Sequence, residues 1–242
     1  MSRLHRGANG LTAAAAAVLL AVAACGPARR PPASTQAARA GSAGAILRGL
    51  PQPIDPGARY LIYLHNQFWE TAAPGEAHPQ FGPYDYEGIL AAFAGRGLTV
   101  IAERRPPDAD PPVSADRVAR QVRDLIAAGV PAQAITVVGF SKGGAIAILA
   151  SSALADDGVN LVVLAGCGRW LALRPDLIPH GRLLSIVEAS DDVAGSCRPL
   201  FERAPPGSRT EEIELDLGGG HGAFFVPRPE WVEPTVAWVL GG

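Results

Sequence analysis

Ile135-Thr-Val-Val-Gly-Phe-Ser-Lys-Gly-Gly144 is the stretch around which this chain is organised. Its first four residues are apolar or β-branched, which predicts a short buried strand, and the alanine-rich run from Lys142 predicts a helix. Between the two lies a match to the pattern G-x-S-x-G. A strand that turns directly into a helix bends sharply, and glycines around the bend let the two approach. Ser141 at the bend then exposes its hydroxyl beside a helix N-terminus, whose free N–H groups favour negative charge.

Short apolar runs alternate with helical patterns on both sides of this stretch. Strands that are apolar throughout and separated by helices predict an α/β fold, with a mostly parallel sheet covered by helices on both faces. Ligands of such sheets bind at the carboxyl ends of the strands. The further strands are expected at residues 60–64, 98–102, 161–165, 183–187 and 211–217, and the further helices at 84–95, 111–128, 196–203 and 230–240.

A serine hydroxyl needs a base that takes its proton during attack and a carboxylate that orients the base. Of the five histidines, His221 lies in the glycine-rich segment Gly218-Gly-Gly-His-Gly222, after the last expected strand. Glycines let the backbone bring an imidazole into a crowded site. A histidine in an ordinary flexible turn is the alternative interpretation. For the acid, either Asp191 or Asp192 follows the strand at 183–187.

A serine at a strand–helix bend, an acid after a later strand and a histidine after the last strand resemble the α/β-hydrolase superfamily. The resemblance covers about residues 58–240. It implies a three-layer sandwich without a separate lid domain, and a serine hydrolase that cleaves a small-molecule ester or thioester through an acyl-enzyme, with no metal or cofactor. Family acids often occur as Asp-x-Val, which Asp191-Asp192-Val193 fits. Asp191 is therefore the preferred acid and Asp192 its substitute.

The resemblance also implies two backbone N–H donors for an oxyanion. One belongs to Lys142, the residue after the serine. The other comes from the loop after the strand at 60–64, where the family often has His-Gly-x and this chain has His65-Asn66-Gln67. Gln67 is the implied second donor, and Asn66 replaces glycine with a residue that tolerates left-handed backbone. His65 is expected to brace the loop.

Two features depart from a minimal hydrolase. The Lys142 side chain stands beside the nucleophile, where it either attracts an anionic substrate or extends to solvent; we favour solvent.

Residues 67–86 form a long loop beside the implied oxyanion donors. The loop either lines a substrate pocket or covers the core, with the aromatic residues Phe68, Trp69, Phe81 and Tyr84.

Residues 1–24 have the form of an export signal. A basic start precedes an apolar, alanine-rich run at residues 11–24, which is too short for a transmembrane helix. The run ends in Val22-Ala-Ala-Cys25, which resembles a bacterial lipobox and implies lipid on Cys25. An ordinary cleaved signal is the alternative.

The segment 25–45 is rich in alanine, proline, serine and arginine and predicts a flexible linker, followed by one domain at 46–242. The export signal and the lipid on Cys25 together predict an exported lipoprotein that is held on the extracytoplasmic side of a membrane. The sequence does not indicate which membrane, or the oligomeric state.

The charge of the chain limits the classes of partner that it can bind, and its cysteines predict a disulfide. The first 45 residues carry five arginines and no acid, so the rest has 16 basic and 23 acidic residues and a formal charge of −7. Such a balance argues against a nucleic-acid partner. Cys167 and Cys197 are the cysteines besides Cys25, and in an exported protein they predict a disulfide.

Other classes of function fit parts of the sequence. A peptidase or amidase would use the same three residue types. A membrane-anchored binding protein on a catalytically inactive hydrolase fold is a second class, but all three triad positions are filled. Thiol redox chemistry by Cys167 and Cys197 is a third, and the absence of a C-x-x-C pair counts against it.

Overall fold

A computed structural model describes residues 44–241. The chain divides into two units, Met1–Arg39 and Ala40–Gly242, and all described residues belong to the second. The expected signal peptide, the lipid site at Cys25 and nearly all of the linker lie outside the described residues. Within 44–241, no helix has both the length and the apolar character needed to cross a bilayer.

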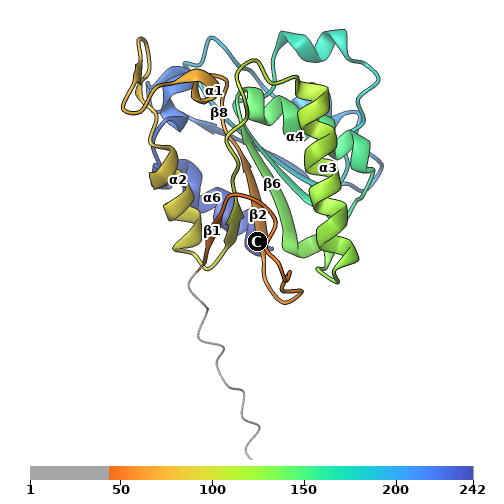
Figure 1. The fold of residues 1–242 in the computed structure, drawn as a ribbon. Helices are drawn as coiled ribbons and strands as arrows, with labels where there is room; N and C mark the ends of the chain where they lie inside the picture. The colour runs from red at the N-terminus through yellow and green to blue at the C-terminus, as the bar shows by residue number, and fades with distance from the viewer. Residues whose placement is uncertain (1–43, 242) are drawn as a thin grey trace, which may run out of the picture. The chain divides into compact units, whose positions relative to one another are not determined.

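The described residues contain a seven-stranded sheet in which every neighbouring pair is parallel (Figure 1). Its order is β1-β5-β2-β6-β7-β8-β9. The predicted α/β architecture and all six predicted strands are confirmed. The strands are β1 (Ile46–Leu47), β2 (Tyr60–Leu64), β5 (Thr99–Ile101), β6 (Ile135–Phe140), β7 (Asn160–Leu164), β8 (Arg182–Glu188) and β9 (Thr210–Leu215).

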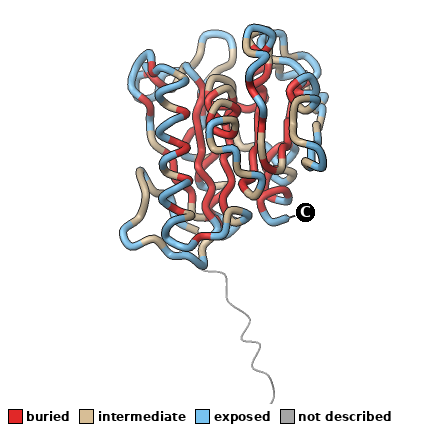
Figure 2. The backbone as a smooth tube through the Cα atoms, turned by 90° about the vertical axis from the view of Figure 1, so that its right-hand side faces the viewer, coloured by how far each residue is buried: buried red, intermediate tan, exposed pale blue. Residues whose placement is uncertain are grey.

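Helices cover both faces of the sheet, as the apolar strands require. Successive side chains of β2 point to opposite faces: Leu61 and Tyr63 join one core cluster, Tyr60 and Ile62 the other. α2 and α6 close the first cluster, and α3 and α4 the second (Figure 1). The buried backbone follows the strands and the inner sides of the helices (Figure 2). The helices are α2 (Tyr86–Ala94), α3 (Pro111–Ala127), α4 (Lys142–Leu154), α6 (Pro229–Leu240) and the short α1 (Phe68–Thr71) and α5 (Arg198–Phe201).

Local signals explain where the long helices begin and end. The Asp110 side chain caps α3 by accepting the N–H of Val113 at 2.9 Å, and prolines fill the first helical positions. The helix stops before Gly129, whose φ of +93° favours glycine. α2 begins two residues later than predicted, because Asp85 caps it by accepting the N–H of Gly88 at 2.9 Å.

Several elements of two to five residues were not predicted, because runs this short carry no periodicity. They include β1, α1 and an antiparallel hairpin of β3 (Ala77–His78) and β4 (Gly82–Pro83). Residues 44–241 also contain three 3₁₀ helices: η1 (Ala132–Ala134), η2 (Arg169–Leu173) and η3 (Gly220–Phe224). α1, η2 and η3 follow the carboxyl ends of β2, β7 and β9, and each carries a residue of the candidate site.

Candidate active site

Ser141 lies at the sharp turn between β6 and α4, with φ 56° and ψ −120°. A non-glycine residue at positive φ stores strain, which the surrounding structure must support. The flanking glycines make the turn possible. A Cβ on Gly139 would stand 2.2 Å from the carbonyl oxygen of Gly143, and a Cβ on Gly143 would stand 2.0 Å from the carbonyl oxygen of Leu64. The predicted strand–turn–helix context of Ser141 is therefore present.

The structure brings Ser141, His221 and Asp191 into one hydrogen-bonded chain. Nε2 of His221 lies 2.8 Å from Oγ of Ser141, and Nδ1 of His221 lies 2.8 Å from Oδ2 of Asp191. The three come from the carboxyl ends of β6, β9 and β8, and the His221 and Asp191 side chains are buried. Asp192 is exposed, and within residues 44–241 its carboxylate makes no hydrogen bond or ion pair.

The environment of Asp191 keeps its carboxylate charged. Burial raises its pKa, but the hydrogen bond from His221 and the N–H groups of Ala194 and Val193 outweigh burial and hold the pKa below its usual value. Val193 and Ala194 donate to Oδ1 at 2.8 and 3.1 Å. An ionised carboxylate only accepts, so Nδ1 of His221 carries the ring proton. Nε2 is then free to accept the proton of Ser141.

Aromatic side chains hold the His221 ring in place. Its centroid lies 5.0 Å from that of Phe140 and 5.8 Å from that of Phe81. Gly222 lets Phe81 approach, because a Cβ at that position would stand 3.1 Å from Cβ of Phe81. The long aromatic loop thus packs beside the base.

Gln67 and Lys142, the two implied oxyanion donors, both line the cleft that contains Ser141. Lys142 is the first residue of α4, where backbone N–H groups lack an intrahelical partner. Gln67 is the N-cap of α1. Asn66 does not use the left-handed backbone that asparagine tolerates, since it is not among the residues with positive φ. Its side chain instead accepts the N–H of Trp69 at 3.0 Å and so starts α1.

The prediction that the Lys142 side chain extends to solvent is wrong. Its Nζ forms an ion pair with Oε2 of Glu70 at 2.8 Å, and the two side chains are 15% and 1% exposed. Glu70 also accepts Nε of Arg105 at 3.0 Å. Lys142 and Arg105 therefore share one buried carboxylate, and the Lys142 side chain is held inside the protein. Sequence alone did not reveal Glu70, which stands 72 positions away in the chain.

His65 braces the loop, as expected. Its Nε2 accepts the backbone N–H of Arg105 at 2.9 Å, so Nδ1 carries the proton and donates to the carbonyl of Asn66 at 2.7 Å. The Arg105 guanidinium donates to the carbonyl groups of His65 and Asn66. Burial and the charge of Arg105 lower the pKa of His65 to about 3. His65 is therefore neutral and structural.

The cleft beside Ser141 has a volume of about 540 Å³. The aromatic residues of the 67–86 loop do not line it; they pack on the core, so the pocket alternative for that loop is not supported. Besides Gln67, Lys142, Asp192 and His221, the larger lining side chains are Arg169, Trp170 and Val193, which the sequence analysis missed. Small residues fill much of the remaining wall: Ala145, Ala165, Gly166, Gly168 and Ala194.

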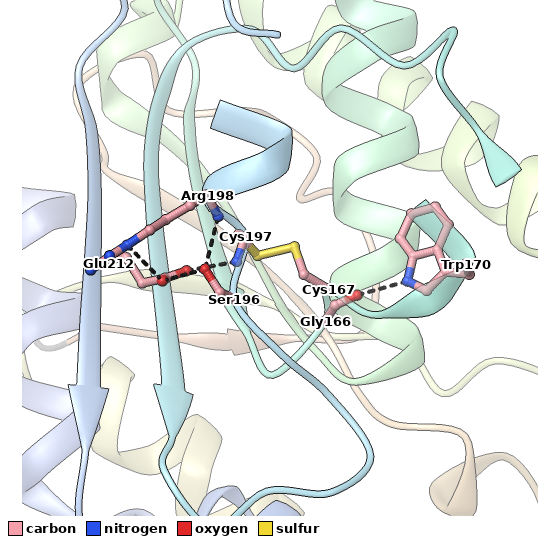
Figure 3. Close-up of a disulfide and its surroundings, with 7 residues drawn as sticks. All are labelled: Gly166, Cys167, Trp170, Ser196, Cys197, Arg198 and Glu212. Carbon is pink, nitrogen blue, oxygen red and sulfur yellow. Dashed lines mark hydrogen bonds and ion pairs between the residues drawn. A yellow bond between two sulfur atoms is a disulfide. The ribbon is translucent and has the colours of Figure 1, made fainter. Parts of the chain in front are cut away.

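The predicted disulfide between Cys167 and Cys197 is confirmed, with a Cα–Cα distance of 5.3 Å (Figure 3). It joins the residues after β7 to the segment that follows Asp191. Glu212 of β9 holds that segment from the other side, by accepting the Cys197 N–H and the Ser196 hydroxyl, each at 2.6 Å. One wall of the cleft is thus covalently tied.

Comparison with known proteins supports the fold. No known family profile matches the chain. The structure of SOBER1 from Arabidopsis thaliana superposes with a TM-score of 0.54 at 14% identity, covering 76% of this chain and 98% of that one. A hormone-sensitive lipase from a metagenome library gives 0.53 at 17% identity, covering 76% of each chain. The described domain has the α/β-hydrolase fold.

A curated acetyl-hydrolase of Streptomyces hygroscopicus is similar in sequence to part of the chain. It is 28% identical over 116 residues, which make up 48% of this chain and 37% of that protein. The chain therefore spans little more than a third of the length of this relative.

Proposed function

We propose that the chain is a serine hydrolase that cleaves a small carboxylic ester or thioester through an acyl-enzyme. The observation that carries the proposal is the unbroken hydrogen-bonded chain from Ser141 through His221 to Asp191. The oriented base, the ionised acid and a strained, cleft-facing serine are the three parts that such chemistry needs. The fold of the domain and the similarity to an acetyl-hydrolase agree with this assignment.

In the proposed reaction, Oγ of Ser141 bonds to the carbonyl carbon of the ester while Nε2 of His221 takes its proton. The carbonyl oxygen becomes an oxyanion, which the N–H groups of Lys142 and Gln67 bind. Asp191 stabilises the imidazolium. His221 then gives the proton to the departing alcohol or thiol, and the acyl group stays on Ser141. Water attacks this acyl group, gives a proton to His221 and releases the acid, and the proton returns to Ser141.

The cleft has room for a small ester beside Ser141. Small residues line much of its wall, while Trp170 and Val193 supply the larger apolar surface. A binding-only role leaves the Ser141–His221–Asp191 alignment without a purpose. Thiol redox chemistry fits poorly, because Cys167 and Cys197 are both buried and already bonded to each other.

Ser141→Ala and His221→Ala should each remove most hydrolysis of p-nitrophenyl acetate and most labelling by a fluorophosphonate. The double variant should lose little more activity than either single variant, because the two residues act as one unit. His180→Ala is the matched control, since His180 forms another histidine–carboxylate pair, with Asp157 at 2.9 Å, on residues that do not line the cleft. Labelling that persists in Ser141→Ala would refute the assignment.

We further propose, from the sequence alone, that the chain is exported and held at a membrane by lipid on Cys25. The support is the apolar segment before Val22-Ala-Ala-Cys25 and the basic, proline-rich stretch after it. The substrate would then be met outside the cytoplasm.

A further inference from the structure

A buried carboxylate, Glu188, stands between the two loops that carry the acid and the base. Glu188 is the last residue of β8 and is 3% exposed. Asp191 follows it by three positions. The neighbouring strand β9 leads to His221, and Glu188 is paired in register with Leu215 of that strand. The reaction as proposed gives Glu188 no part.

Both oxygens of Glu188 are engaged, one by each loop. Oε1 accepts the backbone N–H groups of Leu217 and Gly218, each at 3.0 Å, on the His221 side. Oε2 accepts the N–H of Ser190 at 2.9 Å and its hydroxyl at 2.5 Å, on the Asp191 side. The Ser190 hydroxyl also accepts the N–H of Gly220 at 3.1 Å, so the loops are joined a second time.

The contacts require the charged form of Glu188. Four donors converge on two oxygens, and a protonated carboxyl would present a donor to one of them. Burial raises the pKa of Glu188, but the hydrogen bonds from Ser190, Leu217 and Gly218 outweigh burial and lower it. Glu188 is thus a fixed anionic acceptor at neutral pH.

The loop of His221 needs such an anchor. It contains Gly218 and Gly220, both at positive φ, and glycines give the unanchored backbone many accessible conformations. A base displaced by about 1 Å costs on the order of 10²-fold in rate. The Glu188 contacts lie three residues before His221 and one residue before Asp191, close enough to fix both.

We propose that Glu188, acting through Ser190, is a positioning residue that sets the acid loop against the base loop and so preforms the Asp191–His221 bond. The inference rests on the proposed function. Glu188 itself touches neither substrate nor reacting atoms.

The first test compares Glu188→Gln, Ser190→Ala and Ser190→Thr. The amide of Glu188→Gln cannot accept on both sides, so kcat for p-nitrophenyl acetate should fall on the order of 10²-fold while KM changes little. Ser190→Ala should lower kcat by roughly tenfold, and Ser190→Thr, which keeps the hydroxyl, should retain it. Ser190 is exposed, so its variants keep the test decisive even where Glu188→Gln folds poorly.

Two measurements separate positioning from general support. In an Asp191→Asn background, Glu188→Gln should lose most of its effect on kcat, because Glu188 acts through Asp191. Glu212→Gln is the matched control: Glu212 also accepts a backbone N–H and a serine hydroxyl, but from Ser196 and Cys197 at the far end of the loop after β8, and neither belongs to the loop of His221. It should lower the unfolding temperature and leave kcat in place.

A third measurement needs no activity. The Nδ1 proton of His221, bonded to Asp191, should give a far-downfield NMR signal in the parent, Ser190→Thr and Glu212→Gln, and none in Glu188→Gln or Ser190→Ala. The inference would be overturned if Glu188→Gln and Ser190→Ala kept the downfield signal of the parent. It would also be overturned if Glu188→Gln lowered kcat by the same factor with and without Asp191→Asn. A parent without esterase activity or labelling would overturn the proposed function instead, while the NMR comparison would still decide this one.

Discussion

At the scale of single residues, neighbours decide what each polar group does. Asp191 and Asp192 are adjacent and chemically identical, yet Asp191 accepts from His221, whereas Asp192 is exposed and lines the cleft. The Asp-x-Val pattern was enough to prefer Asp191. No such pattern pointed to Glu188, because an acid at the end of an apolar strand looks like any other surface charge. Lys142 was misjudged for a related reason, since its partner Glu70 is distant in sequence.

The two aspartates should therefore respond very differently to the same change. Asp191→Asn removes the charge that stabilises the imidazolium and disturbs the ring tautomer, so kcat should fall on the order of 10³–10⁴-fold. Asp192→Asn changes an exposed side chain and should cost less than about threefold, or roughly 0.6 kcal/mol in the barrier. Steady-state kinetics on p-nitrophenyl acetate measure both. The reverse ranking would assign the acid to Asp192.

His65 should make the protein lose stability in mild acid. Its pKa is about 3 in the fold and about 6.5 in the unfolded chain, so below pH 6.5 the unfolded chain binds a proton that the fold excludes. The stabilisation is full above pH 6.5 and falls as the pH drops from there toward 3. The free energy of unfolding should be about 2 kcal/mol lower at pH 5 than at pH 7 from this group.

Urea unfolding at the two pH values tests this expectation. Asp191 and Glu188, whose pKa values are lowered in the fold, stabilise it above their unfolded values near 4 and stop doing so at lower pH, so they add little between pH 7 and 5. His65→Gln should be less stable overall, but its free energy of unfolding should change less between pH 7 and pH 5. An equal slope in His65→Gln would contradict the explanation.

At the scale of elements, the predictable parts are those with a period or a long apolar run. The buried strands β2, β6 and β7 are mostly apolar, β8 has an apolar centre, and α3 carries an apolar stripe with a cap at its start. Elements that shape the cleft have neither signal. α1 and η2 are four and five residues long, and their conformation depends on contacts such as the hydrogen bond from Trp69 N–H to Asn66 and the disulfide.

The disulfide should stabilise the domain by constraining the chain between β7 and α5. Cys167 and Cys197 are 30 positions apart, and closing a loop of that length adds about 3–4 kcal/mol by the chain-entropy relation. Replacing both by serine should lower the free energy of unfolding by about that amount, as measured in urea at pH 7. A matched comparison is the parent under reductant, which should approach the same value. No difference between oxidised and reduced parent would contradict this expectation.

At the scale of the whole molecule, the parallel sheet explains why residues so far apart in sequence meet. Every strand of the seven-stranded sheet points the same way, so the loops after β2, β6, β7, β8 and β9 gather at one edge. The order of serine, acid and histidine could be read from the sequence, because each of them follows an expected strand. The cleft lining was not, because Trp170 and Arg169 follow β7 in a segment without a pattern.

The lipid anchor concerns the whole chain and rests on its sequence. Cys25→Ser should leave the protein unprocessed or release it from membranes, since stable attachment needs the acyl chains that the cysteine would carry. Metabolic labelling with a palmitate analogue, followed by membrane fractionation, measures both effects. Ser141→Ala is the control that should remain lipidated. A parent protein that takes up no label would refute the anchor.

The Cys167–Cys197 bond also determines when the cleft reaches its final structure. A reducing cytosol does not sustain such bonds, whereas oxidising compartments form them. If the chain is exported as proposed, Cys167 and Cys197 stay reduced during synthesis, and the disulfide beside Asp191 forms only after translocation. The loops that carry Asp191 and His221 would then reach their final form in the compartment where the substrate is. A copy retained in the cytosol would lack the disulfide and would have a lower free energy of unfolding.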